Sequence, residues 1–221
     1  MPGGIGILGG TFNPIHFGHL RAAEELREQL GLDQVRLIPS AIPPHKEAPN
    51  MAPAPDRLRM VELALMDAPG CAASNIEINR PGPSYSVETL RTLRAELGPD
   101  YRLVFLIGFD AFREFASWKE YAAIFALCDV AVMTRPPWPD RLALKDLPIA
   151  TREAFRYDKS SESFCHSSGR RVQLARITAL DISATAIRSA VAAGRSIRFL
   201  VPPAVADYIA THRLYRRDTA R

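Results

Sequence analysis

Two histidines near the amino terminus have a spacing that suits phosphate binding. His16 and His19 follow a glycine-containing loop, Gly9–Pro14, and stand three residues apart where a helical pattern begins. Residues three apart share one face of a helix, and the free N–H groups and partial positive charge of a helix N-terminus attract anions. Glycines let the backbone come close to a ligand. The stretch therefore predicts a phosphate clamp made of a loop, a helix start and two imidazoles.

Two other interpretations of the histidine pair remain open from the residues alone. Histidines also occur in cores and on surfaces without a role, and two histidines can begin a metal site. A metal site needs a third and a fourth ligand, but no H-E-x-x-H sequence follows, and neither His45 nor His166 has a ligand-like spacing. We therefore expect no metal ligands from protein side chains.

The early glycines do not form either of the common nucleotide fingerprints. Gly4–Gly9 matches G-x-G-x-x-G by its letters, but Gly4 and Gly6 lie inside a predicted strand, whereas the fingerprint needs its glycines in the turn that opens a helix. The sequence G-x-x-x-x-G-K-[ST] is absent, so the chain has no P-loop.

Short apolar runs alternate with segments of helical period, which is typical of a parallel sheet covered by helices. The polar, Ser-rich segment 157–171 is expected to be a mobile loop or a small insertion. We expect a single domain over 1–221, with a core at 1–177 and C-terminal helices at 178–221. Strands are expected at 4–8, at 35–38, from 76, at 103–107, at 129–133 and at 172–177, and helices at 20–30, from 56, from 86, at 183–193 and at 203–212.

The sequence clusters that could carry chemistry come directly after predicted strands. In open parallel sheets, ligands bind beyond the carboxyl ends of the strands. We therefore expect these clusters to meet at the end of the sheet where the carboxyl ends of its strands lie. They are Gly9–His19, Pro43–Lys46, Gly108–Asp110 and Asp181–Arg188.

Composition and charge exclude several classes of protein. The chain has 221 residues, of which 47% are hydrophobic, which is enough for a sizeable core. Its apolar runs, such as Leu103–Ile107, are far shorter than the roughly 18 to 20 residues of a membrane-spanning helix. Met1–Leu8 has no positively charged start and predicts a strand rather than a secretion signal. We expect a cytoplasmic protein with no membrane partner.

A net charge of +4 is mildly basic and suits an anionic ligand, but it is not a nucleic-acid footprint. The arginines that cluster near the carboxyl end are interpreted as a solvated tail, and we expect no nucleic-acid partner. The three cysteines are odd in number and include no C-x-x-C pair, which argues against disulfides and a structural zinc site. The arginines are Arg213, Arg216, Arg217 and Arg221. The cysteines are Cys71, Cys128 and Cys165.

The stretch G-G-T-F-N-P-I-H-F-G-H-L, residues 9–20, resembles the H-x-G-H signature of the nucleotidyltransferase superfamily and is similar to the bacterial nicotinate-nucleotide adenylyltransferases. The resemblance covers nearly the whole chain. Its further segments are I-P-P-H-K at 42–46, P-S-Y-S-V-E-T-L at 83–90, G-F-D at 108–110 followed by Trp118, D-I-S-A-T-A-I-R at 181–188, V-P-P at 201–203 and L-Y-R at 214–216.

This resemblance implies a Rossmann-like open parallel sheet with helices on both faces and a small C-terminal helical part. It also implies an activity, the transfer of the adenylyl group of ATP to nicotinate mononucleotide. The products are nicotinic acid adenine dinucleotide and pyrophosphate, in NAD biosynthesis. Mg²⁺ is the implied cofactor, held mainly by phosphates, and ATP is the co-substrate. A homo-oligomer is possible, but the sequence does not fix the oligomeric state.

The resemblance also assigns residues. The catalytic set is His16, His19, Lys46 and Arg188. The ATP-binding set is Gly9, Gly10, Thr11, His16, His19, Gly108, Asp110, Ile182, Ser183, Thr185 and Arg188. The mononucleotide-binding set is Gly10, Thr11, Lys46, Tyr85, Ser86, Thr89 and Trp118, with Trp118 stacked on the pyridine ring. Competing interpretations are a core role for Trp118, a helix cap for Asp110 and exposed charges for Lys46 and Arg188.

The residue types suit this reaction. A phosphate monoester has a second pKa of about 6, so the attacking 5′-phosphate is largely deprotonated at neutral pH and needs no general base. The barrier instead requires two anions to be brought together and the charge on the α-phosphate and the leaving pyrophosphate to be neutralised.

Asn13 and Ala184 stand where many superfamily members have Asp and Ser, and neither is assigned a catalytic role.

Two alternative functions follow from the same residues. Within the enzymes, the acceptor could be nicotinamide mononucleotide, and phosphopantetheine is disfavoured because its enzymes resemble only the first motif. From another class, the chain could be a non-catalytic nucleotide sensor or an RNA-binding module. A sensor that had lost catalysis would be expected to lose a phosphate ligand, yet His16, His19, Lys46 and Arg188 are all present.

Overall fold

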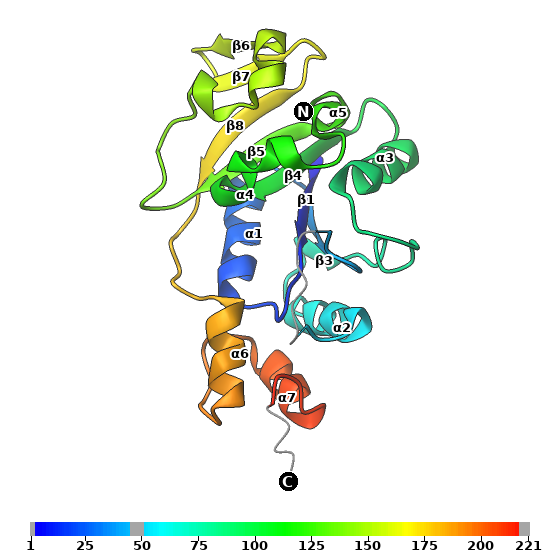
Figure 1. Cartoon of the computed structure of the whole chain (residues 1–221), viewed down its shortest axis with the longest axis vertical. Coiled ribbons are helices and arrows are strands. Elements are labelled where there is room, and N and C mark those ends of the chain that lie inside the picture. Colours follow the sequence, from blue (N-terminus) through cyan, green and yellow to red (C-terminus); the bar gives the residue numbers. More distant parts are fainter. Residues whose placement is uncertain (1–2, 45–50, 217–221) are drawn as a thin grey trace.

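The computed structural model describes residues 3–44 and 51–216, and its centre is one twisted sheet (Figure 1). In sheet order the strands are β3 (Cys71–Ala73), β2 (Gln34–Pro39), β1 (Gly4–Gly10), β4 (Arg102–Gly108), β5 (Asp129–Thr134), β8 (Arg171–Arg176), β7 (Ser163–His166) and β6 (Phe155–Asp158). The first six are parallel, and β7 and β6 are antiparallel at one edge. The sheet is therefore open and mostly parallel, as the alternation predicted.

Helices cover both faces of the sheet, because each central strand alternates its apolar side chains between two cores. Leu8 and Leu106 pack in a core with α1 (Phe17–Gln29), α2 (Ala54–Ala64), α6 (Ala184–Ala192) and α7 (Pro203–Thr211). Ile7 and Phe105 pack in a second core with α3 (Ser86–Leu97), α4 (Phe109–Arg113) and α5 (Tyr121–Leu127). This two-sided arrangement is the Rossmann-like architecture, and three short 3₁₀ helices at 115–117, 144–146 and 149–154 complete it.

One sequence prediction about strands is wrong, and another holds only in part. The segment 157–171, expected to be a mobile loop or a small insertion, is not a loop throughout, because it contributes to the short hairpin β6–β7, which pairs with β8. The signal is weak because these strands are short and lie at the sheet edge, yet Phe155 and Phe164 are buried. The third strand, expected from Ile76, is β3 and ends at Ala73, and Ile76 lies in a turn.

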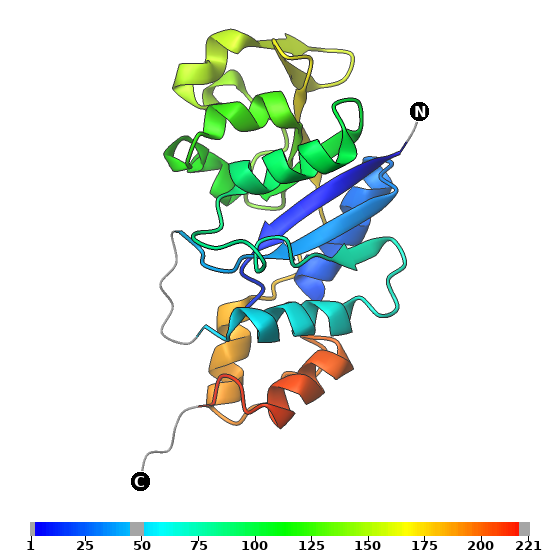
Figure 2. The same ribbon diagram turned by 90° about the vertical axis from the view of Figure 1, so that its right-hand side faces the viewer.

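The C-terminal helices belong to the same core as the sheet. Ile187 of α6 and Val205 of α7 are fully buried and pack in the cluster that contains Leu8. The backbone N–H of Phe17, at the start of α1, donates to the carbonyl of Leu200, 3.1 Å away. The two helices lie together beside α2, at one end of the molecule (Figures 1 and 2). They therefore adjoin the loop between β1 and α1.

Within the described residues, no helix is long and apolar enough to cross a membrane.

Candidate active site

The loop after β1 is held in an unusual conformation. Phe12 has a φ of 45°, in the left-handed region that bulky side chains rarely adopt. Its ring is buried, and it packs edge-on against His19 with ring centroids 5.0 Å apart. The next helix, α1, begins at Phe17, with His16 as its extended N-cap and no acidic residue in its first turn. The loop therefore delivers both histidines to the positive end of a helix, as the sequence predicted.

The two imidazoles form one stacked pair. The ring centroids of His16 and His19 are 3.7 Å apart, with an angle of 23° between the ring planes. His16 is 6% exposed, and its Nδ1 atom has no hydrogen-bond partner among the described residues. A buried ring nitrogen without a partner carries a desolvation cost that a ligand phosphate would remove.

One imidazole of the stacked pair, that of His16, is uncharged at neutral pH. Burial, and secondarily the charge of Arg135, lower the pKa of His16 to about 4. At neutral pH the His16 ring is uncharged, so it can donate a hydrogen bond to a phosphate but adds no positive charge.

The pKa of His16 makes a prediction about stability. An unfolded histidine titrates near 6.5, so between about pH 6.5 and about pH 4 the unfolded chain binds more protons than the folded one. Stability therefore falls as the pH falls through this window. Replacing His16 with glutamine should remove about 2 kcal/mol of the loss between about pH 7 and about pH 5. Urea unfolding of both proteins at the two pH values measures this, and equal losses would contradict it.

Arg188 lies beside the histidine loop. Its Nη1 atom donates to the carbonyl of Asn13 at 2.8 Å, and its Nη2 atom donates to the Thr185 hydroxyl at 3.2 Å. The helix that carries it, α6, is capped by Ser183, whose hydroxyl accepts from the N–H of Ala186. Two segments more than 170 residues apart in the chain therefore meet at one edge of the sheet.

Close packing at this junction explains the glycine of the histidine motif. A Cβ atom on Gly18 would lie 3.0 Å from Nδ1 of His16 and 3.8 Å from the carbonyl oxygen of Ile182. The start of α1 and the Ile182 segment thus pass close to each other, which a larger residue at Gly18 would crowd. Ile182, Ser183 and Thr185, which the sequence assigned to ATP binding, are all on this side of the site.

Arg135 is a further cation that the sequence did not single out. It follows β5 directly, and its Nη1 atom donates to the carbonyl of Leu180, 2.9 Å away. It is close enough to His16 to lower the pKa of that ring. Its position just after the carboxyl end of a central strand was the available signal, but the surrounding prolines made the segment resemble a plain loop.

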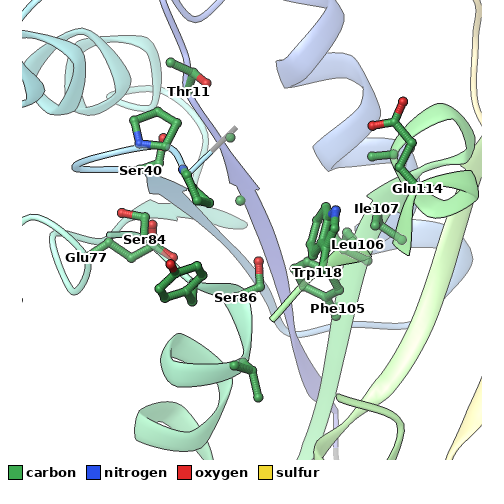
Figure 3. Close-up of a pocket in the computed structure, with 18 of the residues that line it drawn as sticks. Thr11, Ser40, Glu77, Ser84, Ser86, Phe105, Leu106, Ile107, Glu114 and Trp118 are labelled. Carbon is green, nitrogen blue, oxygen red and sulfur yellow. The ribbon is translucent and has the colours of Figure 1, made fainter. Parts of the chain in front are cut away.

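A cavity of about 380 Å³ lies next to this polar region, at the carboxyl ends of β1 and β4 (Figure 3). Thr11 of the histidine loop lines it, so it adjoins the region already described. Eight residues that the sequence assigned to nucleotide binding line the cavity: Gly9, Gly10, Thr11, Tyr85, Ser86, Gly108, Asp110 and Trp118. The pair of histidines and Arg188 do not line it. Lys46 lies outside the described residues.

One wall of the cavity is aromatic. Trp118 faces the cavity from the side opposite Ser84 and Glu77 (Figure 3), and it is supported by the rings of Phe115 and Phe105, with centroids at 5.2 Å and 6.2 Å. Tyr85, at the N-cap of α3, has no side-chain cap for the helix. The cavity thus combines a flat indole with a helix N-terminus that its own side chains leave uncapped.

Thr89, which the sequence assigned to mononucleotide binding, lies behind the cavity wall. It is 2% exposed, and its hydroxyl donates to Oε1 of Glu77 at 2.6 Å and accepts from Nη1 of Arg80 at 3.1 Å. Arg80 also donates to the carbonyl of Tyr85 at 3.5 Å. Through these hydrogen bonds Thr89 holds the start of α3 from behind the cavity wall, while Glu77 lines the cavity itself.

Five polar lining residues were missed by the sequence: Ser40, Glu77, Ser84, Glu114 and Lys119. The Ser40 hydroxyl is buried and has no hydrogen-bond partner within 3–44 and 51–216, whereas the Ser84 hydroxyl accepts from the N–H of Ala41. Ser40 follows the carboxyl end of β2, and this placement was the available signal. The described residues contain no group of three or more His, Cys, Asp or Glu side chains placed to hold a metal ion.

Comparison with known proteins adds to this picture. The cytidylyltransferase-like family model matches residues 7–190. A protein of Syntrophotalea carbinolica, named a probable nicotinate-nucleotide adenylyltransferase, is 47% identical over 212 residues, covering 96% of this chain and 97% of its own. One of the same name from Geobacter metallireducens is 46% identical over 213 residues, covering 96% and 98%. The structure of Plasmodium falciparum nicotinic acid mononucleotide adenylyltransferase complexed with NaAD has a similar fold, with a TM-score of 0.73, 18% identity and coverage of 97% and 98%.

Proposed function

Since the chain belongs to the nicotinate-nucleotide adenylyltransferase family of the cytidylyltransferase-like nucleotidyltransferases, we propose that it transfers the adenylyl group of ATP to nicotinate mononucleotide. The products are nicotinic acid adenine dinucleotide and pyrophosphate, in NAD biosynthesis. One observation supports this proposal beyond family membership. The region that contains His16, His19 and Arg188, here called the polar edge, adjoins an aromatic cavity at Gly9–Thr11.

The two regions divide the substrates between them. The triphosphate of ATP binds at the start of α1, where N–H groups, the imidazoles and the guanidinium of Arg188 converge. The mononucleotide occupies the cavity, with its 5′-phosphate beside Gly10 and Thr11. The two phosphates then meet over the loop, which is where the new bond forms.

Catalysis in this arrangement is positioning and charge neutralisation. The mononucleotide phosphate is already an oxyanion, and it attacks the α-phosphorus of ATP while the bond to pyrophosphate breaks. His16 and His19 donate hydrogen bonds to the phosphate oxygens, and Arg188 neutralises charge on the leaving pyrophosphate. Arg135 adds positive potential from the next strand. Lys46, carried over from the family motif, neutralises the incoming phosphate.

Recognition of the pyridine ring rests on Trp118 and the start of α3. The indole stacks on the ring, and backbone N–H groups at the start of α3, from Ser86 onward, donate hydrogen bonds to the nicotinate carboxylate. The amide group of nicotinamide mononucleotide would instead turn an N–H donor toward the backbone N–H donors of α3, which is unfavourable. On the ATP side, Asp110 lies after β4, exposed at the cavity mouth, and accepts from ribose hydroxyls.

Mg²⁺ fits this site as a counter-ion of the triphosphate. The polar edge presents imidazoles and guanidinium groups rather than a carboxylate cluster, so the ion would be held by phosphate oxygens, with water completing its shell. When bound, it supplies neutralising charge on the β- and γ-phosphates.

We propose the cytoplasm, where ATP is abundant, as the compartment.

The acceptor is tested by pyrophosphate release with each mononucleotide under matched conditions. The charge-assisted contact at α3 should make kcat/KM with nicotinate mononucleotide about 30- to 100-fold higher than with the amide. Equal or higher efficiency with the amide would refute the assigned acceptor while leaving adenylyl transfer intact. No pyrophosphate from either mononucleotide, with ATP still bound, would favour the nucleotide-sensor alternative.

A further inference from the structure

The backbone turn that carries the histidines is pinned by residues far away in the sequence. Arg57 of α2 is 1% exposed, and its guanidinium donates to the carbonyl of Thr11 at 2.7 Å. The same group donates to the carbonyls of Ala52 at 2.9 Å and Ala41 at 3.2 Å. Arg188 holds the carbonyl of Asn13, two residues further along the turn. Guanidinium groups thus hold the carbonyls of the residues before and after Phe12.

A third pin comes from the segment after α7. The phenol of Tyr215 donates to Oδ1 of Asn13 at 2.7 Å, and the same oxygen accepts from the N–H of Ala52 at 3.0 Å. Burial raises the pKa of the Tyr215 phenol, so it remains a donor throughout the physiological range. Asn13 therefore joins the turn to the end of the fold.

Backbone strain lies at two places near this contact, one in the turn and one in the segment after α7. Phe12 has a φ of 45°, and Tyr215 has a φ of 63°. Such conformations cost of order 1–3 kcal/mol each and persist only where the surroundings impose them. Phe12 in turn packs edge-on against the His19 ring. A change in the turn would therefore move an imidazole of the phosphate site.

We propose that Tyr215 is a positioning residue of the ATP phosphate site, acting through Asn13 to hold the Phe12 turn and the His19 ring in the geometry that binds the triphosphate. Its hydroxyl donates to Asn13, and the proposed role acts through that side chain. This inference rests on the proposed function for the identity of the ligand. It assigns the segment after α7 a part in nucleotide binding that its sequence motif does not reveal.

The chain offers a matched control for this role. Tyr208 of α7 also makes one phenol hydrogen bond, to Oδ1 of Asp56 at 2.7 Å, and burial raises its pKa to about 12. That bond joins α7 to α2 but does not touch the histidine turn. Tyr215→Phe and Tyr208→Phe therefore delete the same group, and only the first loosens the turn.

The test measures ATP binding by calorimetry, kcat by pyrophosphate release and the melting temperature of each variant. Losing one hydrogen bond should weaken ATP binding and lower kcat by about five- to tenfold in Tyr215→Phe. Tyr208→Phe should leave both within about twofold, and the two melting temperatures should agree within about 3 °C. In an Asn13→Ala background, Tyr215→Phe should have no further effect on ATP binding.

The outcomes separate this inference from the proposed function. Equal effects of the two tyrosine variants on ATP binding and kcat, or an undiminished Tyr215→Phe effect in the Asn13→Ala background, would overturn the positioning role while adenylyl transfer stands. A wild-type protein that binds ATP but does not use nicotinate mononucleotide would overturn the proposed function, and the calorimetric comparison would still decide the role of Tyr215.

Discussion

Replacing His19 with alanine is expected to lower kcat by about two orders of magnitude, because one preorganised donor to the reacting phosphates is lost at the N-terminus of α1. The ring is half-buried and stacks on His16, so the substitution also frees the partner ring to move. Since the reaction needs no general base, the loss should persist across neutral pH rather than follow a histidine titration. Steady-state pyrophosphate release between about pH 6.5 and about pH 8.5 measures both effects.

The control for this experiment is His212→Ala. His212 is exposed at the end of α7, where its ring stacks on Tyr208 away from the histidine turn. It should keep wild-type kcat, and both variants should keep the wild-type circular dichroism spectrum. Wild-type turnover by His19→Ala would remove that histidine from the mechanism, whatever its place in the motif.

Replacing Arg188 with alanine is expected to have the largest effect, a loss of about a thousandfold in kcat/KM. Two functions disappear together: a positive charge on the leaving pyrophosphate, and the hydrogen bond that holds the Asn13 carbonyl. Arg188→Lys should recover only part of the activity. A lysine can restore the charge but cannot reach Asn13 and Thr185 with one planar fork.

Arg195→Ala is the matched control, because Arg195 is exposed just beyond α6 and does not line the cavity. It should behave like the wild type in kcat/KM and in melting temperature. A lysine at position 188 with full activity would mean that charge alone is required there. An alanine with full activity would exclude Arg188 from pyrophosphate stabilisation altogether.

Much of the fold follows from local signals in the sequence. The run Leu103–Ile107 is fully apolar because it forms a central strand covered on both faces, and β4 lies where this run predicted. Helices with strong periodicity, such as those starting at Ser86 and Pro203, begin at the predicted residues. Weak patterns failed. The hairpin β6–β7 is short and sits at a sheet edge, so few buried positions mark it.

The same division holds for the candidate site. The histidine turn, Tyr85, Ser86 and Asp110 were singled out because each stands in a motif directly after a strand or at a helix start, whereas Trp118 was assigned from the family resemblance alone. Arg135, Ser40 and Glu77 were missed, since each stands alone in a segment without a pattern. Thr89 was assigned to the cavity by its motif, but its side chain turns to Glu77 beneath the wall.

By itself the sequence determined the central strands and the helices with strong periodicity, the family and the residue types available for phosphate binding, because apolar periodicity and glycine placement act over a few residues. Only the tertiary structure decided which of those residues meet. Three features depend on groups that are distant in the chain. They are the hydrogen bond from Arg188 to the Asn13 carbonyl, the hydrogen bonds from Arg57 and Tyr215 to the histidine turn, and the uncharged state of His16. Hydrogen bonding and desolvation act through space, so no local pattern can encode them.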